Sequence, residues 1–381
     1  MRRMKNAKLG LAILGLSGLI AACGGASERA PAAAEPGDAA TTAFSAPGGG
    51  FSVEIPAGWE SSWTKAPTWD SPSQLMLFVG GKSWIDYVAI TVLHFENAAR
   101  TAERYLYDQK QAFAGRTDAT AAESVMKVAG RDSSVLEVRA RRSSPLEATG
   151  EAVPAVVRHV VVPATRGYFV LRYDAPAGVD NAYRATFDRV LGSFAPGDKG
   201  TPIPPDPVPY AEYEVYAALF ASKAPGGIDS PQFFDAIPKG RLVEGATMAL
   251  DKPLPAGWPG KDFGPLDPGM ADDYRKKNAS EWPLTDRILV PWLRVMPPDE
   301  ISARLKEAAE DPTGDIHGWM GLDSSFITLS RVGFSAAGDR ALLSAAFTSP
   351  GAMRAQYLIV MNKTAGTWRL ERAAMEDLIY H

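Results

Sequence analysis

A proline-rich stretch near the middle of the chain divides it into two parts. Residues 197–209 read GDKGTPIPPDPVP and contain five prolines in 13 positions. Proline lacks a backbone N–H and has a fixed φ, so this stretch cannot form a helix or a paired strand and favours stiff, extended backbone. We therefore predict a linker over 197–209 between two folded domains, a division that also fits a length of 381 residues.

The first 22 residues have the organisation of a bacterial export signal. MRRMKNAK carries four basic side chains and no acidic one, and the next 14 residues, LGLAILGLSGLIAA, are apolar apart from Ser17. This apolar run is too short to span a bilayer core, which needs roughly 20 helical residues. We predict that residues 1–22 are a cleaved signal peptide.

The only cysteine of the chain, Cys23, follows this apolar run directly. The four residues Ile20-Ala21-Ala22-Cys23 resemble the lipobox of bacterial lipoproteins. The resemblance implies cleavage before Cys23 and a diacylglyceryl cysteine whose acyl chains, such as palmitate, anchor the protein in a membrane. Each buried CH₂ contributes about 0.8 kcal/mol, so several acyl chains hold a protein without a spanning helix. The alternative is a core cysteine, but no segment directly after Cys23 is apolar enough to build such a core.

The residues after Cys23 indicate where the anchored protein lies. Gly24 stands where an Asp would be expected in lipoproteins that are kept in the inner membrane of enteric bacteria. The absence of Asp resembles lipoproteins that are forwarded to the periplasmic face of the outer membrane. Residues 23–43 have almost no large apolar side chain and are rich in Ala, Gly and Pro, so we predict a flexible tether there.

The charge of the mature chain excludes some partners. Loss of residues 1–22 leaves 36 basic and 44 acidic side chains, a net charge of −8. An acidic protein has no electrostatic reason to bind nucleic acid, so we predict no nucleic-acid partner. With Cys23 acylated, no thiol remains for a disulfide, a zinc site or a nucleophile.

Residues 44–196 have the pattern of an α+β domain. Alternating or continuous apolar runs predict strands, and helical spacing of apolar residues predicts two helices. We expect an antiparallel sheet with packed helices. The predicted strands are 51–55, 74–79, 86–95, 122–128, 134–141, 153–162 and 168–173, and the predicted helices are 98–114 and 179–194.

Two motifs frame this first domain. FSVEIPAGW at 51–59 has the form F-x-V-x-I-P-x-G-W, and FDRVLGSF at 187–194 has the form F-x-x-V-L-x-S-F. Together with a central helix after a β-meander, they resemble the PsbP-like fold, which the Mog family and many small bacterial lipoproteins share. Members of that fold are chiefly binding or assembly modules, so the resemblance implies interaction and no particular activity.

Residues 210–381 predict a second α+β domain that ends in an antiparallel β-meander. In YAEYEVYAALF, the residues Tyr213, Tyr216, Ala217 and Phe220 share one helical face. We expect strands at 241–250 and 286–296, a helix at 298–309, and a four-stranded meander at 326–334, 340–348, 353–363 and 367–373 with short glycine-containing turns. Trp319, residues 329–334, Ala341, Leu342, Gly366 and Trp368 resemble a C-terminal pattern of uncharacterised bacterial proteins, which implies no known reaction.

Few residues indicate a reaction. His94 and His159 fall in predicted strands and would form a metal or base pair if those strands were neighbours; otherwise they are unrelated, half-buried imidazoles. Asp311, Asp315 and His317 lie in a glycine-rich loop, where carboxylates beside an imidazole could bind a divalent ion or act as acid and base. Their spacing fits neither an EF-hand nor a zinc helix, which favours a solvated surface loop. We predict no metal and no cofactor.

A cluster of tryptophans is a second candidate for binding, although packing is the favoured interpretation. Trp59, Trp63, Trp69 and Trp84 lie within 26 residues around a Pro-rich loop, where they either stack on a sugar or peptide or pack in the core. The mature chain has no G-x-S-x-G, H-E-x-x-H or phosphate-loop motif.

These features favour a non-catalytic, lipid-anchored envelope module that binds an envelope protein or a cell-wall partner. The alternatives are an envelope hydrolase that acts on a glycan or peptide around His317, and a stabilising envelope component with no specific ligand.

Overall fold

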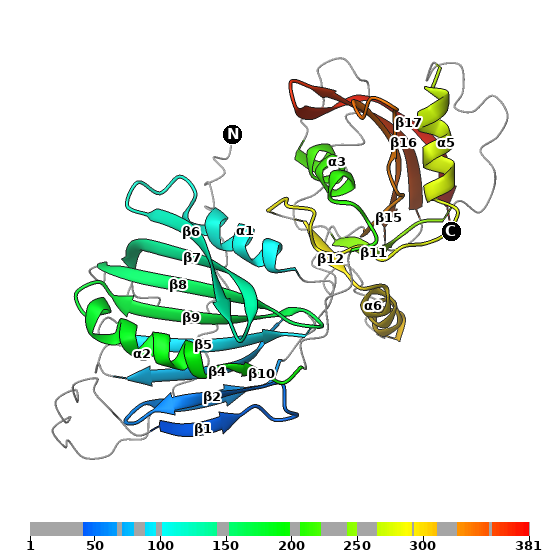
Figure 1. Ribbon diagram of the computed structural model, residues 1–381. Helices are drawn as coiled ribbons and strands as arrows, with labels where there is room; N and C mark the ends of the chain where they lie inside the picture. Colours follow the sequence, from blue (N-terminus) through cyan, green and yellow to red (C-terminus); the bar gives the residue numbers. More distant parts are fainter. Residues whose placement is uncertain are drawn as a thin grey trace, which may run out of the picture. The chain divides into compact units, whose positions relative to one another are not determined.

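Two α+β domains make up the described part of the chain, as the sequence predicts (Figure 1). The computed structural model describes residues 41–66, 71–79, 88–96, 101–142, 152–198, 206–221, 242–249, 265–291, 293–310, 326–349 and 353–380. All of them fall within one compact unit, residues 36–381.

The first domain is built on a seven-stranded antiparallel sheet with the order β3-β4-β5-β9-β8-β7-β6. A three-stranded antiparallel sheet, β1-β2-β10, accompanies it. The strands are β1 (Thr41–Ser45), β2 (Phe51–Pro56), β3 (Glu60–Thr64), β4 (Ser73–Val79), β5 (Val88–Phe95), β6 (Thr120–Val128), β7 (Arg131–Arg142), β8 (Val153–Pro163), β9 (Tyr168–Pro176) and β10 (Ala195–Pro196). Of these, β3 and the short β1 and β10 were not predicted.

Both faces of the large sheet are buried along its central strands. On one face, Phe51 of β2 and Phe187 of α2 (Asp180–Ser193) pack against alternate residues of β9 such as Leu171. On the other face, Tyr105 of α1 (Ala102–Phe113) packs against Tyr168 and its neighbours. Strand residues alternate between faces, so each central strand contributes to both cores. Because both faces of β5, β8 and β9 are buried, these strands have long, nearly continuous apolar runs.

The boundary of the predicted tether differs from the structure. Thr41 to Ala43 belong to β1, where they pair with Pro56, Ile55 and Glu54 of β2. β-Branched threonines suit a paired strand although they carry little apolar surface. The domain therefore begins at least three residues before residue 44.

The second domain contains a seven-stranded mixed sheet with the order β12-β11-β13-β15-β16-β17, and β14 pairs with β15. The predicted antiparallel meander is present, but β11 runs parallel to both β12 and β13, so the sheet is not purely antiparallel. The strands are β11 (Leu242–Thr247), β12 (Arg294–Met296), β13 (Phe326–Leu329), β14 (Gly333–Phe334), β15 (Arg340–Ser349), β16 (Met353–Thr364) and β17 (Thr367–Tyr380); the helices are α3 (Tyr210–Ala221), α5 (Pro268–Lys277) and α6 (Pro298–Glu310).

Two predicted strands are shorter than expected. Among the described residues of 286–296, only Arg294–Met296 form a strand. Tight turns occupy 286–290, where the amides of Arg287 and Val290 donate to the carbonyls two residues before them, each at 2.7 Å. The first meander strand is interrupted at 330–332, where a buried polar network replaces the ladder. Helix α5, which begins after the capping Asp267, was not predicted.

The two described ends of the predicted linker are each fixed by an aspartate. Asp198 accepts hydrogen bonds from Arg131 and Thr165 of the first domain. Asp206 accepts hydrogen bonds from Thr285 and Arg287 of the second domain, at 2.7 and 3.2 Å. Residues 199–205 between them lie outside the described residues.

Candidate functional site

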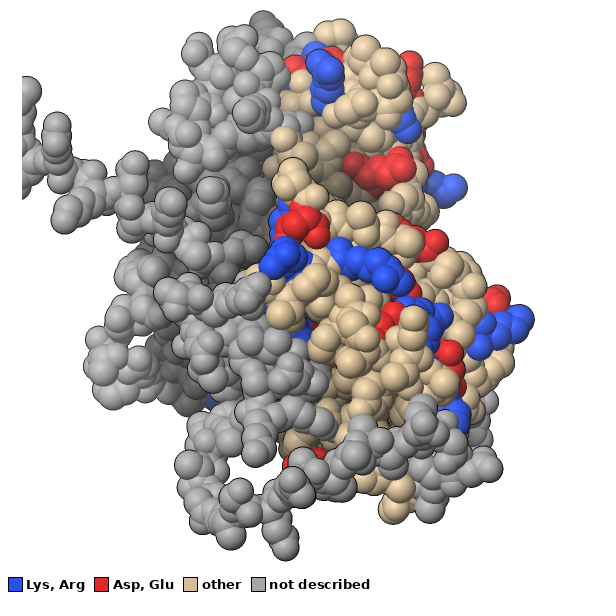
Figure 2. Space-filling view, turned by 90° about the vertical axis from the view of Figure 1, so that its left-hand side faces the viewer, with Lys and Arg blue, Asp and Glu red and all other residues tan. Residues whose placement is uncertain are grey.

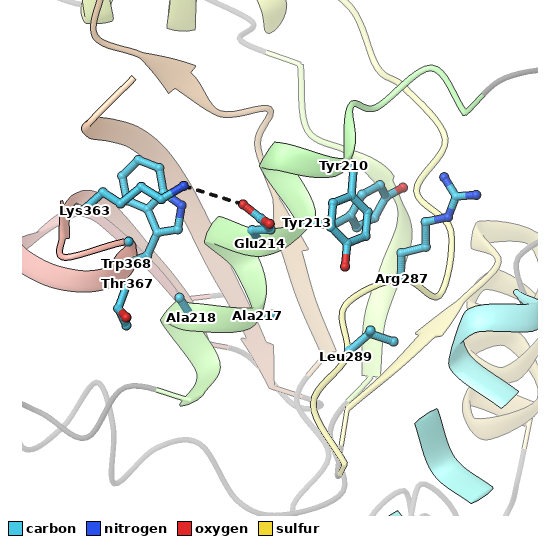
Figure 3. Close-up of a pocket in the computed structure, with 11 residues that line it drawn as sticks. Tyr210, Tyr213, Glu214, Ala217, Ala218, Arg287, Leu289, Lys363, Thr367 and Trp368 are labelled. Carbon is cyan, nitrogen blue, oxygen red and sulfur yellow. Dashed lines mark ion pairs between the residues drawn. The ribbon is translucent and has the colours of Figure 1, made fainter. Parts of the chain in front are cut away.

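The second domain contains an open pocket of about 320 Å³ (Figure 3). Helix α3 forms one side, the hairpin of β16 and β17 a second side, and the turn segment around Arg287 and Leu289 a third. Small-molecule sites in proteins span roughly 300–1,000 Å³, so the pocket is large enough for a small ligand or for part of a larger one.

Helix α3 has one face for the core and another for the pocket. Tyr213, Tyr216 and Phe220 are buried, as the helical spacing predicts. Tyr210 and Glu214 lie one turn apart and remain exposed at the pocket, as the four-residue spacing requires. In Figure 3, Ala217 and Ala218 form a floor of small side chains between the two ends of the pocket. Ala217, predicted on the buried face, lies half-buried at its edge.

The hairpin contributes a lysine and a tryptophan. Ala365 and Gly366 both have positive φ, 50° and 79°, as a two-residue hairpin turn requires. This turn places Lys363 and Trp368 as direct cross-strand partners. The Lys363 ammonium lies 5.3 Å from the centre of the Trp368 ring and 3.8 Å from the Glu214 carboxylate.

The third side is held by the buried carboxylate of Asp206. It accepts hydrogen bonds from the Tyr213 hydroxyl at 3.2 Å and the Thr285 hydroxyl at 2.7 Å. Burial raises the pKa of Tyr213 well above its usual value, so the phenol stays protonated and donates. Arg287 reaches the same carboxylate and also lies 3.5 Å from Glu103 of α1.

Helix α1 holds the main chain of this third side. The guanidinium of Arg104, which is fully buried, donates hydrogen bonds to the carbonyls of Ile288 at 2.9 Å and Val290 at 3.0 Å. Thr101 donates to the carbonyl of Asp286 at 3.2 Å. The backbone on both sides of Leu289 is thereby fixed, which sets the position of this pocket residue.

The charges that line the pocket are paired. Glu214 faces Lys363, and Arg287 faces Asp206 and Glu103. Figure 2 shows basic and acidic side chains interspersed on the visible face rather than one patch of a single sign. Among the described lining residues there is no His or Cys, and no pair of carboxylates. This arrangement can orient a ligand through aromatic, hydroxyl and charged groups.

The sequence-predicted histidines do not form a pair. His94 lies opposite Phe169 and His159 opposite Arg172, on the two sides of β9. Positions 169 and 172 are three apart in a strand, so the two imidazoles point to opposite faces of the sheet. His94 stacks on Phe169 at 4.2 Å, and His159 Nδ1 lies 2.9 Å from the Tyr105 hydroxyl. They are unrelated imidazoles.

Several other candidates lie outside the described residues: Cys23, Asp311, Asp315, His317, Trp69, Trp84 and Trp319. Trp59 and Trp63 are described and pack against the first core, Trp59 on Tyr183 and Trp63 on Phe51. These two tryptophans therefore support the packing interpretation. Within the described ranges, no cluster of His, Cys, Asp or Glu could hold a metal ion, and no helix is long and apolar enough to cross a membrane.

The motif L-S-R-V-G-F at 329–334 belongs to the scaffold of the second domain. Arg331 is paired with the fully buried Glu212 of α3, and Asn278 accepts a hydrogen bond from the Arg331 amide at 2.7 Å. At Gly333 a Cβ would lie 2.5 Å from Tyr274, so glycine permits the close approach of α5. The motif at 329–334 thus holds α3 and α5 on the sheet.

Most residues of the pocket were not predicted from the sequence. Tyr210, Glu214, Arg287 and Lys363 were not singled out, and Trp368 was noted only within the C-terminal pattern. The four-residue spacing of Tyr210 and Glu214 opposite the apolar face of α3 was the available signal. Arg287 and Lys363, which are far from α3 in the sequence, had no such signal.

Solved structures resemble this chain over less than half of its length. Cyanobacterial PsbP (CyanoP) from Synechocystis sp. PCC 6803 is 14% identical, covers 46% of this chain and 98% of its own, and has a TM-score of 0.29. The Ran-binding protein Mog1p of Saccharomyces cerevisiae is 12% identical, with 42% and 98% covered and a TM-score of 0.28. LpqN of Mycobacterium tuberculosis, which is involved in cell envelope biogenesis, is 12% identical, with 42% and 86% covered and a TM-score of 0.25.

A chain from Bacteroides thetaiotaomicron is 15% identical with a TM-score of 0.27; the match covers 46% of this chain and 56% of that one. No protein-family model matches the chain, and no curated protein is similar to it. The neighbours thus include the PsbP and Mog1 folds that the first domain was predicted to resemble. At these TM-scores the likeness carries no argument about ligand, partner or activity.

Proposed function

We propose that this chain is a lipid-anchored cell-envelope protein that binds a partner in the pocket of its second domain and catalyses no reaction. The anchor is the diacylglyceryl group that the lipobox Ile20-Ala21-Ala22-Cys23 specifies. Residues after Cys23 serve as a tether, and the absence of Asp at position 24 supports the periplasmic face of the outer membrane. The partner is an envelope protein or a component of the cell wall.

The pocket is the observation that carries the binding role. It combines the exposed ring of Tyr210 with a floor of alanines and charged groups that are already paired. Ligand sites are typically built in this way, from apolar and aromatic surface with a few placed polar groups. These groups support a binding role for the pocket.

Site-specific photocrosslinking in the producing cell tests the binding role. A benzoylphenylalanine replaces Tyr210 at the pocket in one variant and Met375 of β17 in a matched control, since the two side chains are 55% and 54% exposed. We expect a discrete adduct from position 210 that is absent from position 375. The same adducts from both positions, or none from position 210, would contradict the proposal.

Membrane fractionation tests the anchor separately. Cys23→Ser should release the protein from membranes, because no acyl chain can then be attached. Unchanged fractionation of this variant would exclude lipid anchoring without affecting the binding role.

A further inference from the structure

Two residues that line the pocket carry buried hydrogen-bond donors that lack acceptors. Trp368 Nε1 and Arg287 Nε are both buried and have no hydrogen-bond partner among the described residues. They lie on different sides of the pocket, one on β17 and one on the turn segment. In Figure 3 the Trp368 nitrogen is on the side of the ring toward Glu214 and α3. An unsatisfied buried N–H costs about 1–3 kcal/mol, so an acceptor oxygen of a ligand relieves that cost once a small shift of the side chain uncovers the donor.

The pocket has no unpaired charge to offer a ligand. Lys363 is matched by Glu214, and Arg287 by Asp206 and Glu103. An anionic or cationic ligand would have to separate one of these pairs, and leaving a partly buried charge without its partner is costly. A ligand with acceptor oxygens and no net charge avoids this separation.

The Lys363–Glu214 pair leaves room for a hydroxyl. Its nitrogen and oxygen are 3.8 Å apart, whereas a close charge-assisted hydrogen bond measures about 2.7–2.9 Å. A hydroxyl group accepts from an ammonium and donates to a carboxylate at the same time. Ligand hydroxyls can therefore bind between these two side chains without breaking the charge balance.

Aromatic surface completes the recognition. Tyr210 is 55% exposed at the rim, and Ala217 and Ala218 line the same pocket with small apolar side chains. The C–H face of a sugar ring packs against an aromatic ring, while the hydroxyls at its edge meet the polar groups of the site.

We propose that the pocket binds a neutral saccharide of one or two rings, a ligand class that rests on the binding role proposed above. A sugar supplies vicinal hydroxyls, acceptor oxygens and an apolar face, and it carries no charge. A neutral peptide shares the carbonyl acceptors but lacks the hydroxyls that suit the Lys363–Glu214 pair, so it is the less suited ligand.

Saturation-transfer NMR with the purified full chain tests this class. The probes are cellobiose and N,N′-diacetylchitobiose as neutral disaccharides, glucuronate as a charged sugar, and N-acetyl-Ala-Ala-amide as a neutral peptide. Each is used at about 10 mM, so that a Kd near ~1 mM is detected. The variants are Tyr210→Ala, Trp368→Phe and the exposure-matched control Met375→Ala.

We expect saturation transfer to at least one neutral disaccharide and none to glucuronate. Tyr210→Ala should abolish the signal and Met375→Ala should retain it. Trp368→Phe keeps an aromatic ring but removes the N–H together with the pyrrole ring, so it should weaken binding about tenfold.

If the peptide alone binds and Tyr210→Ala abolishes its signal, the saccharide class is wrong and the pocket is still a binding site. Preference for glucuronate would overturn the neutral class. If no probe responds to the pocket substitutions, the saccharide proposal fails, while the crosslinking experiment decides the binding role independently.

Discussion

Arg331 and Glu212 form a bidentate ion pair in the interior of the second domain, with both N–O distances at 2.8 Å. Burial alone would lower the pKa of Arg331, but the hydrogen bond and the charge of Glu212 outweigh it and hold that pKa above its usual value. Glu212 also accepts a hydrogen bond from the Val332 amide at 2.9 Å. This pair joins α3, and with it one side of the pocket, to the broken strand between β13 and β14.

Removal of one member of this pair should destabilise the protein strongly. Arg331→Met removes the bidentate partner of the buried Glu212 carboxylate and leaves it only the longer contact with the Lys277 ammonium at 3.6 Å, so the free energy of unfolding should fall by about 3 kcal/mol. The double variant Glu212→Leu/Arg331→Met should recover a large part of that loss, because no buried charge remains. Urea unfolding measures both, and a loss below ~0.5 kcal/mol in Arg331→Met would contradict this account.

Removal of the Arg104 guanidinium should destabilise the turn segment that forms the third side of the pocket. Arg104→Met removes the donors to the carbonyls of Ile288 and Val290, and we expect a loss of about 3 kcal/mol in the free energy of unfolding. Hydrogen exchange should also become faster in residues 286–291. Arg139→Met is the control, because that side chain is 56% exposed; its effect should stay within ~0.5 kcal/mol. Equal exchange in the two variants would show that Arg104 does not hold the segment.

His159 should make stability depend on pH. Its burial, and next the charge of Arg172, lower its pKa to about 3 from an ordinary 6.5. In this range the unfolded chain binds more protons than the folded chain, so stability is fully present above about pH 6.5 and falls as the pH drops toward 3, by up to about 1.4 kcal/mol per unit.

Urea unfolding at a series of pH values from about 7 to 5 measures this slope. His159→Gln should flatten it, since glutamine does not titrate. His94→Gln should remove a smaller part, because the pKa of His94 is also lowered by burial, but its side chain is partly exposed. A His159→Gln slope as steep as that of the wild type would show that another group causes the dependence.

Substitutions in the predicted loop around His317 distinguish the binding role from the hydrolase alternative. If the pocket on α3 is the functional site, the combined variant Asp311→Ala, Asp315→Ala and His317→Ala should keep the adduct formed by the photoreactive residue at position 210. Loss of that adduct, with the protein still folded by circular dichroism, would favour the alternative site in the loop.

Local patterns predicted most of the fold, because each depends on residues close in the sequence. The alternation of FSVEI gave β2, and the spacing of Tyr213, Tyr216 and Phe220 gave the buried face of α3. The stretch 286–291 was misjudged as a strand. Its apolar residues are buried, as those of a strand would be. Its backbone groups, however, form hydrogen bonds within tight turns and with Arg104, which is 184 residues away from Ile288 in the sequence.

The candidate site was harder to predict for the same reason. Lys363 and Glu214 are far apart in the sequence and meet only because the hairpin turn at Ala365 and Gly366 brings β16 and β17 beside α3. Neither residue stands in a motif. The tryptophans that attracted attention, Trp59 and Trp63, are packing residues of the first domain.

Binding of the purified chain to washed envelope fragments of the producing cell tests the central claim most directly. Ala218→Trp places a large ring on the floor of the pocket, while Met375→Trp adds the same ring at an exposed position of β17 away from it. With folding verified by thermal unfolding, we predict that Ala218→Trp weakens binding at least about tenfold and that Met375→Trp binds like the wild type. Equal binding by all three proteins would show that the pocket is not the binding site.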